Sequence, residues 1–89
     1  MDNLIIEGVL CEEFNEEDQV FIERFVRAEL FAFNDNCLSS LKNLPVLPSL
    51  LKLEMCYNKI RTGLEAFQVY KTLREIKLRG NRIAQIEEV

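Results

Sequence analysis

The sequence predicts an α/β fold: a right-handed solenoid with short parallel strands on a concave face and helical or irregular returns on the convex face. The main observation is a pattern, LxxLxLxxNxL, at residues 50–60 that recurs at 73–83, 23 residues later. A further copy begins at Ala28, 22 residues before the first, with its apolar positions and its asparagine in the same register. Spacings of this size are typical of leucine-rich repeats, in which each unit buries its apolar face by stacking on its neighbours.

The repeats predict a single leucine-rich-repeat domain over residues 1–89. A worn first repeat with a helix is expected at 1–27, with Leu4 and Ile6 at the strand positions and Val9 in place of the asparagine. The later repeats are then 28–49, 50–72 and 73–89, the last incomplete and without a C-terminal cap. Within each strand, alternate apolar residues point to one face and form the core.

The recurring asparagine is expected to have a structural role. It stands where the strand ends and the chain turns, and its amide can both donate to and accept from backbone groups that would otherwise be buried without partners. Asn36, Asn58 and Asn81 are therefore predicted to stack as a ladder.

The return segments carry their own signals. Pro45 and Pro48 argue against a regular helix in the return after the second strand, whereas the 64–72 return has no helix breaker. Asn15, followed by three acidic residues, is typical of a helix N-terminus, and a helix over 15–26 is expected to cover the first strand. Its inward face would hold Phe21, Ile22 and Phe25.

The C-terminal end of the stack is expected to be partly bare. The residues concerned are Leu73, Ile76, Leu78, Ile83, Ile86 and Val89. Either the chain continues in a longer protein, or this uncapped end packs on a second copy, which makes self-association a candidate partner interaction.

Composition excludes several classes of site. The chain has no histidine, and its three cysteines lack CxxC spacing, so we expect free thiols, no metal site and no cofactor. No glycine-rich phosphate loop or GxSxG motif is present, so no catalytic residue is assigned and the protein is expected not to be an enzyme. No apolar run reaches the roughly 18 residues of a membrane helix, so no membrane partner is expected.

Charge is unevenly distributed along the chain. Residues 1–25 contain eight acids and one base, whereas residues 26–89 contain seven acids and ten bases. Such a separation either reflects solvated faces or steers a charged partner towards one end.

The concave face provides the candidate binding residues. Neighbouring strands should place Lys52 opposite Glu75 and Glu54 opposite Lys77, so that these charges largely neutralise each other. Tyrosine and arginine often anchor protein interfaces. The predicted partner-binding set is Leu30, Lys52, Glu54, Tyr57, Arg74, Lys77 and Arg79.

Several stretches give a more specific resemblance: Asn43-Leu44-Pro45, the two LxxLxLxxNxI copies and Gly63-Leu64-Glu65. In this order they resemble the acidic leucine-rich nuclear phosphoprotein family over about two thirds of the chain. The resemblance implies a nuclear protein that shuttles to the cytoplasm and uses its repeats for protein contacts. It also implies chromatin regulation, with histones or a protein phosphatase, which it would inhibit, as partners. The family's C-terminal cap and long acidic tail are not in this sequence, so histone-chaperone activity would belong to a longer parent protein.

The sequence therefore favours a non-catalytic protein-interaction module. One alternative is a splicing-factor-type or phosphatase-regulator repeat protein. Another is a nucleic-acid-associated adaptor, suggested by the bases Lys59, Arg61, Lys71, Arg74, Lys77, Arg79 and Arg82. Acidic net charge and the paired Lys77 argue against nucleic acid as the partner.

Overall fold

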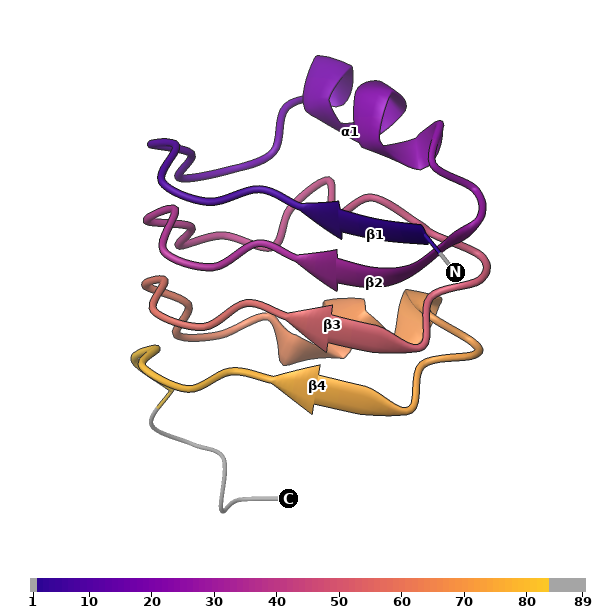
Figure 1. Cartoon of the computed structure of the whole chain (residues 1–89). Coiled ribbons are helices and arrows are strands. Elements are labelled where there is room, and N and C mark those ends of the chain that lie inside the picture. The colour runs from indigo at the N-terminus through magenta and orange to yellow at the C-terminus, as the bar shows by residue number, and fades with distance from the viewer. Residues whose placement is uncertain (1, 84–89) are drawn as a thin grey trace.

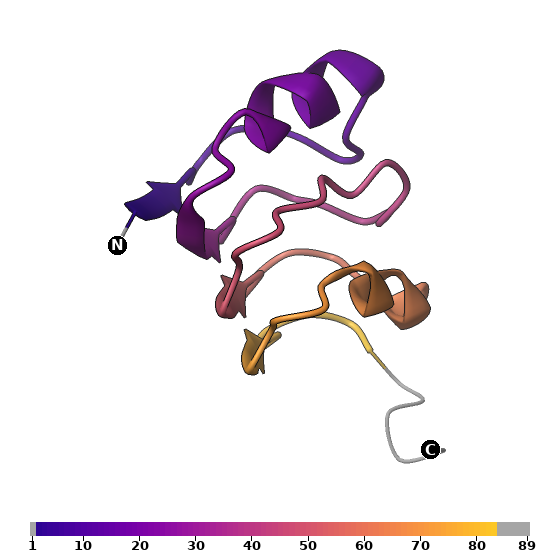
Figure 2. The ribbon, with the colours of Figure 1, turned by 90° about the vertical axis from the view of Figure 1, so that its right-hand side faces the viewer.

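Four short parallel strands organise the computed structural model, which describes residues 2–83. They are β1 (Asp2–Ile5), β2 (Ala28–Ala32), β3 (Lys52–Glu54) and β4 (Glu75–Lys77), and they lie side by side in the order β1-β2-β3-β4. The chain reaches each next strand through a return segment behind the sheet, as parallel strands require (Figure 1). Figure 2 shows the strands along one side of the molecule and the returns along the other.

The strands pair in the register that the repeat spacing predicts. Leu30 lies opposite Lys52, and Lys52 opposite Glu75. β1 pairs with β2 in the same way, although the register shifts between Asp2 and Asn3. Side chains alternate between the core and the opposite face of the sheet, which we call the open face.

The acidic N-terminal segment forms the α-helix α1 (Glu16–Glu23). Asn15 caps it: the Asn15 side chain accepts from the Asp18 backbone N–H at 2.7 Å, and the Asp18 carboxylate accepts from the Asn15 N–H at 3.1 Å. This reciprocal pair satisfies two backbone donors that a helix start leaves open. The predicted cap is confirmed, whereas the helix ends three residues earlier than the predicted 15–26.

The prediction that one face of this helix is buried is only partly correct. Ile22 is buried in the core, but Phe21 and Phe25 are 52% and 39% exposed. Their rings pack edge to face with ring centroids 5.6 Å apart, so they cover each other rather than the first strand.

The other returns differ from one another. Residues 38–50 contain no helix, in keeping with the two prolines. The 64–72 return, in which the sequence has no helix breaker, contains a short 3₁₀ helix, η1 (Leu64–Val69), which follows Gly63 in a left-handed conformation with φ 86°.

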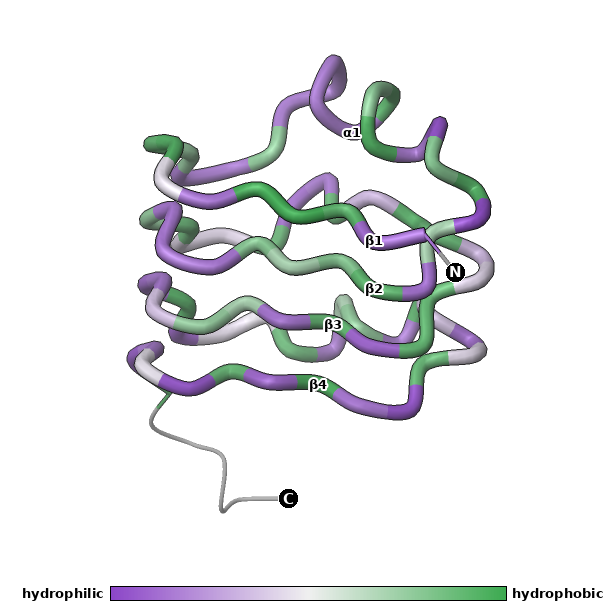
Figure 3. Tube along the Cα trace, viewed as in Figure 1, coloured by the Kyte–Doolittle hydropathy of each residue, from purple (hydrophilic) through white to green (hydrophobic). Residues whose placement is uncertain are grey.

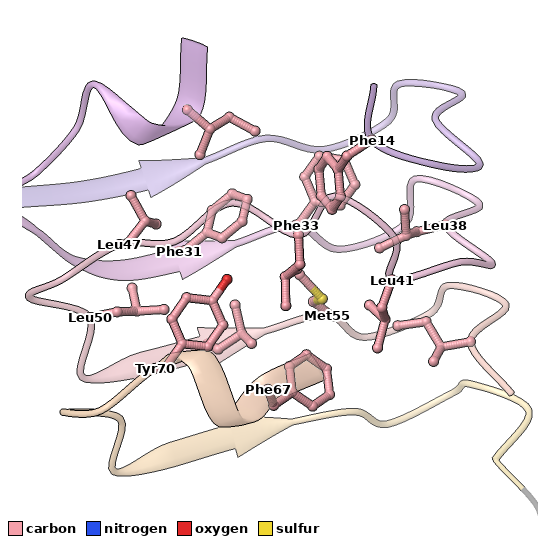
Figure 4. Packing of buried hydrophobic residues seen from close by; sticks show 14 residues of the cluster. Phe14, Phe31, Phe33, Leu38, Leu41, Leu47, Leu50, Met55, Phe67 and Tyr70 are labelled. Atoms are coloured by element: carbon pink, nitrogen blue, oxygen red, sulfur yellow. The ribbon is translucent and has the colours of Figure 1, made fainter. Parts of the chain in front are cut away.

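The core lies between the sheet and the returns (Figure 4). Phe31, Leu53 and Met55 point into it from β2 and β3 and the residues next to them and are fully buried. Phe14, from the segment before α1, packs against Phe33 with ring centroids 4.9 Å apart. β1 is hydrophilic at its start and apolar at its end, and hydrophilic residues predominate in β4 (Figure 3).

The three recurring asparagines bond to the backbone of the neighbouring turn. Asn58 accepts from the backbone N–H groups of Asn36 and Leu38 at 2.9 and 3.0 Å and donates to the Phe33 carbonyl at 2.8 Å. One turn earlier, Asn36 accepts from the Val9 N–H and donates to the Ile6 carbonyl. Asn81 does so one turn later: it accepts from the Ile60 N–H at 3.0 Å and donates to the Met55 carbonyl at 2.7 Å.

The fold class requires a correction. The described chain has a radius of gyration of 12.2 Å and extents of 33 × 27 × 19 Å. A globular domain of this length has a radius of about 12 Å. The structure is therefore a small compact α/β domain with four parallel strands and little helix, and it replaces the predicted right-handed leucine-rich-repeat solenoid.

At the β4 end, Ile76 is 39% exposed and Leu73, Leu78 and Ile83 are half-buried. The other two residues of the predicted bare end, Ile86 and Val89, lie outside the described residues. Within residues 2–83, no helix has the length and apolar character to cross a membrane.

Replacing Asn58 by alanine should lower the free energy of unfolding by about 1–3 kcal/mol, because buried backbone donors and an acceptor would lose their partner. Urea unfolding measures the loss, with Gln68→Ala, at an exposed position, as the control. Equal midpoints for the two variants would contradict a structural role for the asparagine amide.

Tyr70→Phe should also destabilise the fold, by about 1–3 kcal/mol, because the buried Tyr70 hydroxyl donates to the Pro45 carbonyl.

Burial, and secondarily the charge of Glu23, raises the pKa of Tyr70 above its ordinary value of 10.0. The folded state therefore keeps this proton after the unfolded chain loses it, so stability should fall as the pH rises above about 10. Unfolding measured between neutral and strongly alkaline pH should show a weaker alkaline decline in Tyr70→Phe, and identical slopes would contradict this origin.

Candidate functional site: a groove on the open face

An open groove of about 710 Å³ lies on the open face, near the carboxyl ends of the strands. The residues that line it come from all four strand-and-turn units and are Glu7, Asn34, Asp35, Glu54, Cys56, Tyr57, Lys77, Leu78 and Arg79. The volume falls within the roughly 300–1,000 Å³ of typical ligand sites.

Charge in the groove is divided by position. Its acids come from the first three strands and the turns after them: Glu7, Asp35 and Glu54. Its bases come from β4 and the turn after it: Lys77 and Arg79. A ligand in the groove would therefore meet negative charge at one end and positive charge at the other. This arrangement selects for orientation as well as for affinity.

Ion pairs next to the groove connect the charged columns of β3 and β4. Lys52 lies 3.6 Å from Glu54 and 4.0 Å from Glu75, and Lys77 lies 3.8 Å from Glu75. Glu54 also accepts a hydrogen bond from the Asn34 amide at 3.2 Å. These side chains are substantially exposed, so the pairs contribute about 0–1 kcal/mol each to stability. Their main effect is to neutralise the charges locally.

The predicted facing pairs are realised only in part. Lys52 and Glu75 form an ion pair, whereas Glu54 and Lys77 share a register position but bond to other partners. Among residues 2–83, no ion pair involves Arg79, whose backbone carbonyl accepts from the Tyr57 N–H at 2.7 Å. Within the described part of the chain, Arg79 is thus the base of the groove that forms no ion pair.

Tyr57 has an unusual backbone. Its φ is 59°, a left-handed conformation that bulky residues rarely adopt, and its side chain is 57% exposed. The ring lies against Gly80, because a Cβ built on that glycine would overlap the Tyr57 Cδ1. Strain of this kind persists only where the surroundings hold it, and it often marks functional positions.

The left-handed turn position recurs after each strand. Gly8, Asp35, Tyr57 and Gly80 all have positive φ, between 59° and 80°. Three of these four residues line the groove or contact its tyrosine. The turns therefore shape this side of the sheet.

The structure separates the seven predicted binding residues into two groups. Glu54, Tyr57, Lys77 and Arg79 line the groove. The half-buried Leu30 and Lys52 and the exposed Arg74 lie outside it, towards the amino ends of the strands. Their roles in binding remain predictions.

Sequence reasoning omitted some lining residues. Asn34 and Asp35 occupy the pattern positions of Cys56 and Tyr57 one repeat earlier, so comparison of equivalent positions could have found them. Glu7 gave no such signal, because it stands in the worn first repeat. The structure shows free thiols at Cys11, Cys37 and Cys56, and among the described residues no group of three or more His, Cys, Asp or Glu side chains could hold a metal ion.

Comparison with known proteins finds a relative named as a histone variant, from Tetrahymena thermophila. The chain is 35% identical to it over 80 residues. The matched part is 88% of this chain but only 20% of that relative, so the likeness concerns a small portion of a much longer protein.

The family assignment based on the sequence motifs is wrong on these comparisons. No family model matches the chain, and no solved structure matches it. The relative is named as a histone variant, and nothing in the match supports the acidic leucine-rich nuclear phosphoprotein family or phosphatase inhibition. Short repeat motifs are shared widely because they specify a local backbone, so they are weak markers of a particular family.

Gly80→Ala should destabilise the protein more than Gly8→Ala, although both glycines have positive φ. A Cβ at position 8 meets nothing within 4 Å, so that variant measures backbone strain alone, about 1 kcal/mol. At position 80 the Cβ also collides with the Tyr57 ring. Urea unfolding compares the two.

Adding Tyr57→Ala should relieve the collision, so the double variant Tyr57→Ala/Gly80→Ala should lose less stability than the sum of its single changes, by about 0.5–3 kcal/mol. Strict additivity would show that the tyrosine ring does not rest on Gly80 in solution.

Proposed function

We propose that this chain is a non-catalytic protein-interaction module of a chromatin-associated nuclear protein, and that the open-face groove binds its protein partner. The observation that carries the proposal is the groove itself, in which an exposed tyrosine and an exposed arginine lie among acids and bases that occupy opposite ends. Tyrosine and arginine are the residues that most often dominate binding energy at protein interfaces.

The chromatin part of the proposal rests on similarity. The relative is named as a histone variant, and its name motivates both the nuclear location and a histone-containing partner. Since only a small portion of that relative is matched, we extend to this chain a shared setting and not the relative's identity.

Absence of catalysis is supported by the residue types available. The sequence has no histidine, the residue that most often supplies general acid–base chemistry near neutral pH. The groove instead offers carboxylates, cationic groups and a phenol, which suit recognition of a polar protein surface.

The proposal predicts that purified nucleosomes bind the full chain, and that Tyr57→Ala and Arg79→Glu each weaken binding at least about tenfold, equivalent to 1.4 kcal/mol. Fluorescence anisotropy of a labelled chain measures the affinity. Arg61→Glu serves as the matched control, because it makes the same charge change at an exposed site outside the groove.

The outcomes separate the two parts of the proposal. No binding of the unaltered chain would refute a nucleosomal partner. Equal losses in Arg79→Glu and Arg61→Glu, with none in Tyr57→Ala, would refute the groove and leave only long-range attraction. Efficient competition by free DNA, with affinity falling steeply as salt rises, would favour the nucleic-acid alternative.

A further inference from the structure

A second, larger hollow lies between the turn after β1 and α1. Its volume is about 890 Å³. The chain leaves β1, turns, and returns to α1 at this end of the sheet (Figure 1). The hollow shares no lining residue with the open-face groove.

The inner surface of this hollow is apolar. Phe14, Ile22 and Phe33 form part of its lining and are buried members of the core. Exposed apolar side chains also border it: Leu10 is 88% exposed, and Val9 and Phe21 are likewise exposed. Side chains that remain this exposed beside an apolar hollow are typical of an interaction site.

The charged groups around the hollow are mainly acidic. Glu12, Glu13 and Asp18 line it, with Lys59 as the only base among the described lining residues. Cys11, in the lining, has the pKa of its thiol raised by burial and secondarily by the charge of Asp18, although a backbone hydrogen bond partly opposes this. The surrounding segment, residues 1–25, carries eight acids and one base.

From this geometry we propose that the hollow docks a basic peptide segment of a partner protein, with an apolar side chain inserted between Phe21 and Leu10 and lysines or arginines facing Glu12 and Glu13. Burial of the peptide's apolar side chain against the apolar lining supplies affinity. The acidic residues around the hollow favour peptides with lysines or arginines beside that side chain. The volume is ample for a short peptide with bulky side chains.

Charge also argues against two other occupants. An anionic membrane surface would be repelled by the excess of acids in residues 1–25. A second copy that presented the same end would bring two such acidic segments together, which is unfavourable at low salt. A basic peptide removes the repulsion and covers the apolar residues.

The test uses the full chain and a fluorescein-labelled synthetic peptide with a central Leu-Phe pair flanked on both sides by lysines. Binding is followed by anisotropy at low and physiological salt. Glu13→Lys should weaken binding at least about tenfold, and the matched control Glu65→Lys, an exposed site on η1 with the same charge change, should have little effect. Leu10→Ser should weaken binding in the same way, with Val69→Ser as its control.

Peptide variants test the two recognition elements separately. Serines in place of the Leu-Phe pair, or glutamates in place of the lysines, should each reduce affinity by a similar factor. Unfolding midpoints of all protein variants are measured in parallel, and little change is expected because the altered side chains are exposed.

Several results would overturn the proposal. Equal losses in Glu13→Lys and Glu65→Lys would mean that only net charge matters. Loss of peptide binding in Tyr57→Ala but not in Leu10→Ser would place the peptide in the open-face groove. Concentration-dependent dimerisation that Leu10→Ser abolishes, seen by sedimentation, would assign the hollow to a second copy. Because the two surfaces share no lining residue, nucleosome binding through the groove can fail while this proposal stands, and the reverse also holds.

Discussion

The asparagine amide at the end of each strand is the interaction on which the architecture depends. Three-residue strands such as β3 and β4 offer few ladder hydrogen bonds, and the turns that follow them would leave backbone groups buried without partners. Asn58 accepts from two N–H groups of the preceding turn and also donates to the Phe33 carbonyl, which follows β2. Since no buried side-chain polar atom among the described residues lacks a partner, short strands and irregular returns can stack without a continuous helix layer.

The same turns also shape the candidate site. The left-handed residue just before the asparagine position is a glycine in two turns, an aspartate in one and a tyrosine in another. At Tyr57 the chain accepts an unfavourable φ for a bulky side chain, and the ring is held against Gly80 beside the groove. Tyr57 therefore belongs both to the turn that stabilises the fold and to the lining of the groove on the open face. This coupling explains why stability and binding would both respond to a change there.

The two surfaces have opposite designs. The groove is polar, with acids and bases at separate ends, whereas the hollow beside α1 is apolar inside with acids around it. The charge separation noted in the sequence acquires a structural meaning here, because residues 1–25 provide most of the lining of the hollow. One partner could therefore occupy both sites, with a basic segment that inserts an apolar side chain into the hollow and a surface of mixed charge that binds the groove.

The sequence by itself determined the strand positions, their register, the asparagine contacts and the N-cap of α1, because each depends on local spacing and on residues that recur in equivalent places. It misidentified the family and the fold class, since short repeat motifs specify local backbone and not descent or overall shape. Only the tertiary structure decided that Tyr57 and Arg79 share a groove from which Leu30 and Arg74 are excluded, and that Phe21 stays exposed beside a hollow. Both surfaces depend on the paths of turns and returns, which differ from repeat to repeat and are fixed by packing between segments far apart in the sequence.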